Sequence, residues 1–184
     1  MFIRTERLFL RPGWPEDFED LVEVLDDDAV GRSIGALSLP RTPAEVRAYL
    51  KRPRDVRLPQ CLINLRGESG PRVIGSIGLV PAGEEVELGC WIIRGYQGHG
   101  YAAEAVRAVL SQARTLGYSK VIARDFSESG ASARVLLQSG FEPAGEMGSR
   151  MRLARQSGKH AKRYVAVLAD KFADWVGARG VSHA

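Results

Sequence analysis

The chain has 184 residues, of which 45% are hydrophobic and 26% are charged, a composition typical of one folded domain that covers residues 1–184. No apolar run approaches the roughly 18 residues that a membrane span needs, and residues 1–6 lack the features of a signal peptide, so we expect no membrane partner and a cytoplasmic location. The net charge of +4 is modest, and the aromatic interleaving of nucleic-acid readers is missing, so we expect no nucleic-acid partner.

The first third of the chain predicts one strand and two helices. Residues 7–12 alternate like a strand, and the acidic Pro15-Glu16-Asp17 begins a helix. Thr42-Pro43-Ala44-Glu45 supplies an N-cap, a first-turn proline and a reciprocal glutamate for a helix over 43–51. Residues 28–40, between the two helices, are expected to form a loop.

The middle of the chain predicts an antiparallel meander of three strands, followed by a helix and another strand. Turn compositions rich in Gly and Pro separate the three β-rich runs. Apolar residues then recur at helical spacing over 102–116, and Gly117 is a typical residue to follow such a helix. The predicted strands cover residues 61–65, 72–80, 86–93 and 118–126.

The last two of these strands and the helix between them form one βαβ unit, whose strands must be parallel. Because the other strands pair antiparallel, the expected fold class is α/β (α+β), with a mixed, mostly antiparallel sheet and helices on both faces. The remaining elements expected are a helix over 131–138, strands over 141–147 and 163–168, and a helix over 171–178.

The cysteines and histidines give no sign of a metal centre. Cys61 and Cys90 lie in apolar segments without C-x-x-C spacing, and His99, His160 and His183 are scattered. Metal sites in proteins use such ligands at short, regular spacings. We therefore predict no metal and two reduced, buried thiols.

Residues 94–105 read R-G-Y-Q-G-H-G-Y-A-A-E-A and connect the first strand of the βαβ unit to its helix. Gly98 and Gly100 let the backbone turn sharply, which brings consecutive N–H groups to the positive end of the helix dipole. Such a turn binds anions. A phosphorylated cofactor is therefore the first hypothesis, and a turn that only changes the chain direction is the alternative.

A nicotinamide dinucleotide is a second candidate for this turn. Gly98-x-Gly100-x-x-Ala103 fits the relaxed dinucleotide fingerprint, and Asp125 lies where an acid that binds ribose is expected. A doubly wound fold, however, carries this fingerprint in the first of several βαβ units. Here about half of the chain precedes the turn, which weakens the dinucleotide interpretation.

Four short blocks of the chain are informative together. They are Thr5-Glu6-Arg7-Leu8, the strand Glu87-Leu88-Gly89-Cys90-Trp91, the turn from Gln97 to Ala105, and Ser132 through Gly140-Phe141. In their order and spacing, which match over nearly the whole chain, they resemble the GCN5-related N-acetyltransferase (GNAT) family, and within it the branch of ribosomal-protein N-terminal acetyltransferases. The resemblance implies that the chain binds acetyl-CoA as a co-substrate, within a core of about residues 72–145.

The resemblance also assigns residues to the acetyl-CoA site. It implies that consecutive N–H groups of the turn hold the CoA pyrophosphate, and that backbone groups of the preceding strand hold the pantetheine and acetyl groups. A serine at the start of the next helix lies near the CoA sulfur. The residues so assigned are Trp91, Ile92, Ile93, Gln97, Gly98, His99, Gly100, Tyr101, Ala102, Ser129 and Ser132.

The chain departs from the family pattern at three places. Gly95 replaces a usual Gln or Arg before the first motif glycine, and Arg94 is the expected substitute for that basic group. Ser129 replaces a usual asparagine. Leu136 stands where relatives outside this branch have a tyrosine that acts as the acid, so this chain has no tyrosine acid there.

Glu87 and Ser132 are the candidate catalytic residues. An ammonium acceptor has a pKa of about 8 to 10.4, so a base helps to deprotonate it at neutral pH, and Glu87 lies on the strand that leads to the turn. Ser132 is placed to donate a proton to the departing thiolate. The alternatives are a solvated strand glutamate and a serine that satisfies a free N–H at the helix start. Glu104 is explained as an acid in the first turn of a helix.

The predicted function is acetyl transfer from acetyl-CoA directly to a primary amine, with a protein N-terminus as the acceptor that the branch favours. An amino acid, a polyamine or an aminoglycoside is the alternative acceptor. Residues 28–40 and 150–160 are expected to bind the acceptor, in a monomer or a homodimer. A nicotinamide oxidoreductase and a CoA-binding module without catalysis remain as rival classes.

Overall fold

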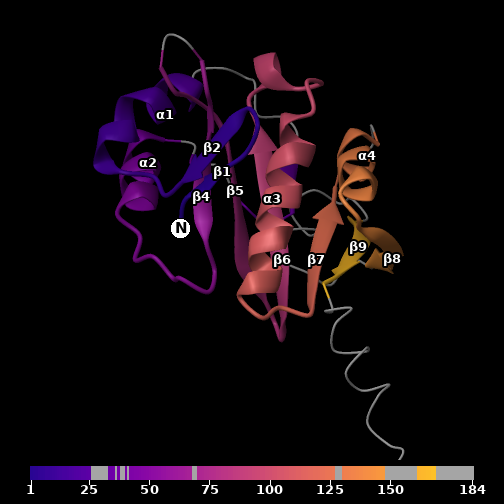
Figure 1. The fold of residues 1–184 in the computed structure, drawn as a ribbon. Coiled ribbons are helices and arrows are strands. Elements are labelled where there is room, and N and C mark those ends of the chain that lie inside the picture. The colour runs from indigo at the N-terminus through magenta and orange to yellow at the C-terminus, as the bar shows by residue number, and fades with distance from the viewer. Residues whose placement is uncertain are drawn as a thin grey trace, which may run out of the picture.

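The computed structural model describes residues 1–25, 33–35, 37, 40, 42–67, 70–126, 130–147 and 161–168. Within these residues nine strands form a single sheet in the order β1-β2-β4-β5-β6-β3-β7-β9-β8 (Figure 1). The strands are β1 (Ile3–Arg4), β2 (Leu8–Arg11), β3 (Ser33–Ile34), β4 (Gln60–Leu65), β5 (Arg72–Ala82), β6 (Glu85–Ile92), β7 (Lys120–Asp125), β8 (Glu142–Met147) and β9 (Ala161–Val167). The helices are α1 (Phe18–Leu25), α2 (Pro43–Leu50), α3 (Tyr101–Thr115) and α4 (Ala131–Gln138), with 3₁₀ turns η1 (Pro15–Asp17) and η2 (Arg94–Tyr96).

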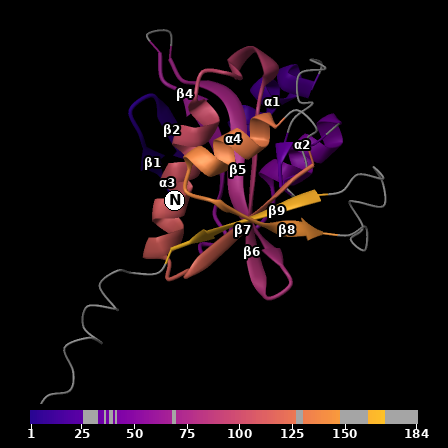
Figure 2. The same cartoon turned by 90° about the vertical axis from the view of Figure 1, so that its right-hand side faces the viewer.

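The helices cover both faces of the sheet, as predicted. Helices α1 and α2 lie on one face, and α3 and α4 lie on the other (Figure 2). Apolar residues at helical spacing on α3, such as Val106 and Val109, pack against one side of β6, including Leu88. On the other face Leu21 of α1 and Val46 of α2 pack with alternate strand residues.

The local signals at the helix ends were correct. The Thr42 side chain accepts a hydrogen bond from the Glu45 N–H at 3.2 Å, and α2 begins at Pro43. Helix α3 ends before Gly117, whose φ of +88° is the left-handed conformation that favours glycine after a helix. The helix predicted at 15–25 begins with the 3₁₀ turn η1.

Strands β6 and β7 separate beyond a single described parallel pairing, between Glu87 and Ile122. The short strand β3 lies in the gap, where Ile34 pairs with both Cys90 and Asp125. We expected only a loop at 28–40, and this is a correction. Diverging strands leave backbone groups without partners, and β3 satisfies part of them. Two residues carry no periodic pattern, so the sequence does not reveal such a strand.

The sheet topology is incompatible with the dinucleotide alternative. Among the described strands β6–β7 is the one parallel pair, and β5 pairs antiparallel with β6 over the whole length of β6. A doubly wound dinucleotide fold needs several parallel strands in succession. Asp125 ends β7 with 2% of its surface exposed, so it is not placed as an accessible ribose ligand.

Some predictions fall outside the described residues. They are the terminal helix at 171–178, the proposed acceptor segment at 150–160, and Ser129. In the part of the chain that the structure describes, no helix is long and apolar enough to cross a membrane.

Candidate acetyl-CoA site

The glycine turn has the geometry of an anion-binding site. Gly98 and Gly100 have φ values of +82° and +81°, and Gly100 is the N-cap of α3. Only glycine adopts this conformation without strain. A Cβ added to Gly98 would meet no atom within 4 Å, so the space over the turn is open. The two motif glycines are therefore required by the backbone of the turn.

The N–H groups of this turn are available for a ligand. The Glu104 N–H is the first to donate into the helix, to the Gly100 carbonyl at 3.1 Å. Among the described residues the N–H groups of residues 98–103 donate no hydrogen bond to a backbone carbonyl. Free N–H groups at the positive end of a 15-residue helix attract phosphate. The residues present thus fit the pyrophosphate of CoA.

A cavity of about 360 Å³ adjoins the turn, between β6, α3 and α4. It brings together eight of the residues that the sequence assigned to acetyl-CoA, from three separate parts of the chain. These residues are Trp91, Ile92, Gln97, Gly98, Gly100, Tyr101, Ala102 and Ser132.

Three other predicted residues do not line this cavity. Ile93 packs on the α1–α2 face of the sheet, and its N–H donates to the Ile74 carbonyl at 2.9 Å, so this donor is used within the sheet. The His99 ring turns back to the Gln97 carbonyl at 2.9 Å. Arg94, the expected substitute for a basic group, is exposed in η2.

Among the described residues that line the cavity, Arg134 is the one with a charged side chain. The sequence interpretation missed it. Ala131, Val135 and Gln138 line the same wall, at the i, i+4 and i+7 spacing of one helix face. This spacing, which begins at Ala131, was the signal in the sequence that could have indicated that one face of α4 lines the cavity.

Ser132 lies at the edge of the cavity, with 6% of its surface exposed, as the second residue of α4. The N-cap position belongs to Gly130, which has a φ of +65°. Ser132 therefore does not cap the helix, and the structural alternative for this serine loses its main support.

Glu87 is not among the residues that line the cavity. Side chains alternate along a strand, and Glu87 shares its face with Trp91 and Ile93, whereas Leu88 and Ile92 face α3. Only 1% of its surface is exposed, so the alternative of a solvated glutamate is wrong. Its Oε2 lies 3.2 Å from Nη1 of Arg124 on β7, which is also buried.

The segment around β3 covers Glu87 from the α1–α2 side. A Cβ added to Gly35 would lie 2.3 Å from the Leu88 carbonyl oxygen and 3.1 Å from Oε1 of Glu87. A Cβ added to Gly89 would lie 2.5 Å from Cβ of Leu37. The Gly35 N–H also donates to the Arg124 carbonyl at 2.8 Å. Gly35 is thus packed against the Glu87 carboxylate, and Leu37 is packed against Gly89 of β6.

Cys90 also lines the cavity, but its thiol is a poor nucleophile. Burial raises the pKa of Cys90 to about 12 and that of Cys61 to about 11. Only the thiolate attacks carbonyl carbons efficiently. Both cysteines are free and buried, as predicted from the sequence. Covalent catalysis through Cys90 is therefore disfavoured.

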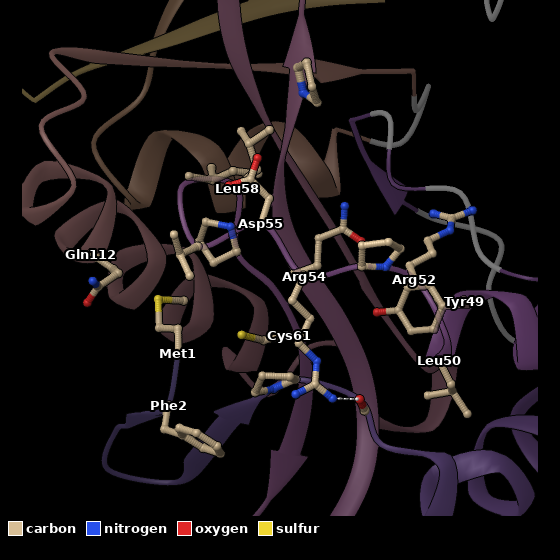
Figure 3. Close-up of a pocket in the computed structure, with 18 residues that line it drawn as sticks. Met1, Phe2, Tyr49, Leu50, Arg52, Arg54, Asp55, Leu58, Cys61 and Gln112 are labelled. Atoms are coloured by element: carbon tan, nitrogen blue, oxygen red, sulfur yellow. Dashed lines mark hydrogen bonds between the residues drawn. The ribbon is translucent and has the colours of Figure 1, made fainter.

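A second cavity, of about 490 Å³, lies beside the segment that connects α2 to β4 (Figure 3). Its wall includes Tyr49 of α2 and Cys61 of β4, and Arg54 donates a hydrogen bond to the Gly13 carbonyl at 2.9 Å. Gln112, near the end of α3, also lines it. It contains none of the predicted site residues. Among the described residues no group of three or more His, Cys, Asp or Glu is arranged to hold a metal ion.

Comparison with known proteins identifies related chains. Residues 7–142 match the family model described as "Acetyltransferase (GNAT) domain". YoaA of Bacillus subtilis (strain 168), an uncharacterized N-acetyltransferase, is 29% identical over 156 residues, which are 78% of this chain and 84% of that protein.

Two solved structures have a similar fold. A GNAT-family acetyltransferase from Bacillus anthracis gives a TM-score of 0.74 at 21% identity, over 92% of this chain and 100% of the other. A proposed ribosomal-protein-serine acetyltransferase from Vibrio cholerae gives a TM-score of 0.69 at 19% identity, over 91% of this chain and 97% of the other. The mixed α/β fold predicted from the sequence is confirmed.

Proposed function

We propose that this chain, which belongs to the GNAT acetyltransferase family, transfers the acetyl group of acetyl-CoA directly to a primary amine. The acceptor that we propose is the N-terminus of a protein. In this reaction the amine nitrogen forms a bond to the acetyl carbon, and the bond from that carbon to sulfur breaks. The amine loses a proton and the departing thiolate gains one. The chain has to bind the phosphates, orient the thioester and move these two protons.

The observation that carries the proposal is the row of N–H groups at residues 98–103 beside the cavity. Hydrogen bonds to a charged group contribute about 1.5–3 kcal/mol each, so a few of them anchor a pyrophosphate firmly. From this anchor the pantetheine arm follows the cavity along β6 toward Cys90. The carbonyl of Ile92 already accepts a hydrogen bond from the Gln97 side chain at 2.8 Å. The Ile92 N–H is the strand donor that we assign to the pantetheine or acetyl oxygen.

Ser132 and Glu87 divide the two proton transfers. Ser132 lines the cavity and donates to the thiolate, whose parent thiol has a pKa of about 8.5, so this demand is mild. Glu87 accepts the amine proton through water from the α1–α2 face. Because Glu87 is buried and Gly35 is packed against it, the acceptor gains access to the carboxylate only when the backbone at Gly35 shifts.

The choice of a protein N-terminus rests on the resemblance of the four sequence blocks to the ribosomal-protein branch. The name of the Vibrio cholerae protein is in keeping with it, but at 19% identity that similarity concerns the fold. A small-molecule amine, such as an amino acid, a polyamine or an aminoglycoside, is the alternative acceptor on the same scaffold.

The test is incubation of the purified protein with [¹⁴C]acetyl-CoA and a cell lysate, followed by separation of proteins from small molecules. We expect label on protein N-termini, and none with heat-inactivated protein. Label confined to small molecules would contradict the proposed acceptor. Absence of label from both fractions would contradict catalysis and favour a module that only binds CoA.

A calorimetric titration tests the cofactor separately. We expect saturable heat with acetyl-CoA and none with NADH. The reverse result would restore the oxidoreductase hypothesis and overturn the assignment of the glycine turn to CoA.

A further inference from the structure

The N-terminal segment of the chain is bonded directly to the start of α3. The Glu104 carboxylate accepts a hydrogen bond from the Thr5 hydroxyl at 2.6 Å and from the Arg7 N–H at 2.9 Å. The Arg7 guanidinium donates to the other carboxylate oxygen from Nε at 2.8 Å and from Nη2 at 2.7 Å. Glu104 is therefore more than an acid that complements a helix dipole, because it attaches residues 5–7 to the helix.

The same guanidinium also reaches the glycine turn. Its Nη1 donates to the His99 carbonyl at 2.9 Å. The group lies over the Tyr101 ring at 4.7 Å from the ring centroid, and the His99 ring stacks against Tyr101 at 5.7 Å. Arg7 thus connects the first turn of α3 to the peptide group between the two motif glycines.

The bond to the His99 carbonyl fixes the direction of a ligand-binding N–H. In a trans peptide the C=O and the following N–H point in opposite directions. The peptide that carries the His99 carbonyl also carries the Gly100 N–H. When Arg7 holds this carbonyl, the Gly100 N–H points away from Arg7. Gly100 lines the cavity, whereas Arg7 does not.

The two motif glycines make it necessary to fix the orientation of the peptide between them. At Gly98 and Gly100 the backbone has φ values near +82°, in a region where glycine has wide conformational freedom. A peptide between two such residues can rotate at little cost. A rigid planar guanidinium, which donates to Glu104 and to His99 at once, removes that freedom.

We propose that Arg7 is a positioning residue for acetyl-CoA: it orients the Gly100 N–H toward the pyrophosphate, and Glu104 holds it in place. The proposal rests on the assignment of the turn to CoA in the proposed function. It explains why two sequence blocks separated by about 90 residues occur together, since they form one phosphate site. Arg7 acts through the turn, without contact to the ligand.

The test compares CoA with pantetheine, which lacks the pyrophosphate. In wild-type protein we expect CoA to bind far more tightly than pantetheine in calorimetric titration and competition. For Arg7→Gln we expect the Kd of CoA to rise about 10-fold, the effect of one lost charge-assisted hydrogen bond, and the Kd of pantetheine to stay unchanged. Equal loss for both ligands, or no loss for CoA, would overturn the proposal.

Arg66→Gln is the matched control. Arg66 donates to the Thr5 and Glu6 carbonyls at 3.3 and 3.1 Å, so it holds the same segment without contact to the turn. We expect it to leave the Kd of CoA unchanged, and a rise equal to that of Arg7→Gln would show a merely structural role. Arg7→Lys keeps the charge without the planar fork. If Arg7→Gln does not fold, Arg7→Lys takes its place in the test. For Arg7→Lys we expect a smaller rise in the Kd of CoA and no change in the Kd of pantetheine. An unchanged Kd of CoA would contradict the proposal.

The Gly100 amide provides a direct signal. In ¹⁵N NMR spectra we expect CoA to shift this resonance strongly in wild-type protein and weakly in Arg7→Gln. An equal shift in both would contradict the positioning role. Failure of wild-type protein to distinguish CoA from pantetheine would instead refute the assignment of the turn to CoA.

Discussion

The carboxylate of Glu87 and the guanidinium of Arg124 form a buried ion pair at 3.2 Å, between β6 and β7 at the level where these strands begin to separate. Two residues before Glu87, at the start of β6, Glu85 binds Lys120 and Arg163, each at 2.9 Å. These contacts hold the two strands together on one side of the gap that β3 enters. The proposed base therefore also contributes to the geometry of the site.

This double role makes a paired experiment necessary for Glu87. We expect Glu87→Gln to lower kcat by about 10²–10⁴, the usual effect of losing a general base, without change in the Kd of CoA. The same substitution leaves Arg124 buried without its ion partner, which costs about 3–5 kcal/mol of stability. Steady-state kinetics and thermal unfolding measure the two effects.

The double variant Glu87→Gln/Arg124→Met separates them. Removal of both charges restores much of the stability, since a buried pair is often replaceable by apolar groups. We expect the double variant to unfold at a higher temperature than Glu87→Gln and to remain equally inactive. Recovery of kcat along with stability would show that Glu87 has a structural role alone.

Ser132→Ala tests the protonation of the thiolate. We expect kcat to fall about 10-fold or more and the Kd of CoA to change little, because the hydroxyl acts on the leaving group. Ser139→Ala, at the C-cap of the same helix, is the control. Its hydroxyl donates to the Val135 carbonyl at 2.7 Å. Equal kcat in Ser132→Ala and wild type would exclude Ser132 from the mechanism.

Arg134→Gln tests the cationic wall of the cavity. We expect the Kd of CoA to rise about 10-fold, as a charged hydrogen-bond donor to a phosphate is lost. The difference from wild type should shrink at high salt, because Arg134 is exposed and screened. Arg107→Gln, an exposed position on α3 outside the cavity, should bind CoA like wild type. A salt-independent loss would argue for a change in folding instead.

Gly89→Ala tests the contact between Leu37 and β6. The added Cβ would lie 2.5 Å from Cβ of Leu37, closer than two carbon atoms can pack. We expect the free energy of unfolding to fall by about 1–3 kcal/mol, as in other overpacked sites. Gly95→Ala is the control, because a Cβ there meets no atom within 4 Å. If chemical denaturation finds the two variants equally stable, the segment does not lie on Gly89 in solution.

The ionisation of Glu104 should make the stability of the fold depend on pH. Burial alone would raise the pKa of this carboxyl, but the hydrogen bonds from Thr5 and Arg7 outweigh it and hold the pKa below its ordinary value of 4.5. A lowered pKa stabilises the fold fully above the unfolded value, and this contribution is lost as the pH falls through the folded pKa. Wild type should therefore exceed Glu104→Gln in Tm near neutral pH.

This advantage should decline as the pH falls below 4.5 and be lost once the pH has passed through the lowered pKa of the folded state. Glu19→Gln, at an exposed position on α1, is the control and should track wild type across the range. A Tm difference between wild type and Glu104→Gln that stays constant down to pH 3 would contradict the role of the Glu104 carboxylate. Differential scanning calorimetry at stepped pH provides the measurement.

Local chemistry made much of this fold predictable. Thr42 and Pro43 indicated the start of α2, and Gly117 the end of α3, because a helix terminus is satisfied by residues next to it in sequence. The glycine turn was predictable for the same reason, since Gly98 and Gly100 determine its backbone within four residues. The strand β3 was not, because it exists only where β6 and β7 diverge.

The sequence by itself determined the order of the longer helices and strands, the mixed sheet and the position of the glycine turn, all of which follow from backbone preferences and side-chain periodicity over short stretches. Tertiary structure alone decided that Glu87 pairs with Arg124, that Gly35 and Leu37 cover β6, and that Arg7 reaches His99. These partners lie far apart in the chain. Their contacts depend on which strands become neighbours and on which face each side chain lies, and no local pattern encodes either.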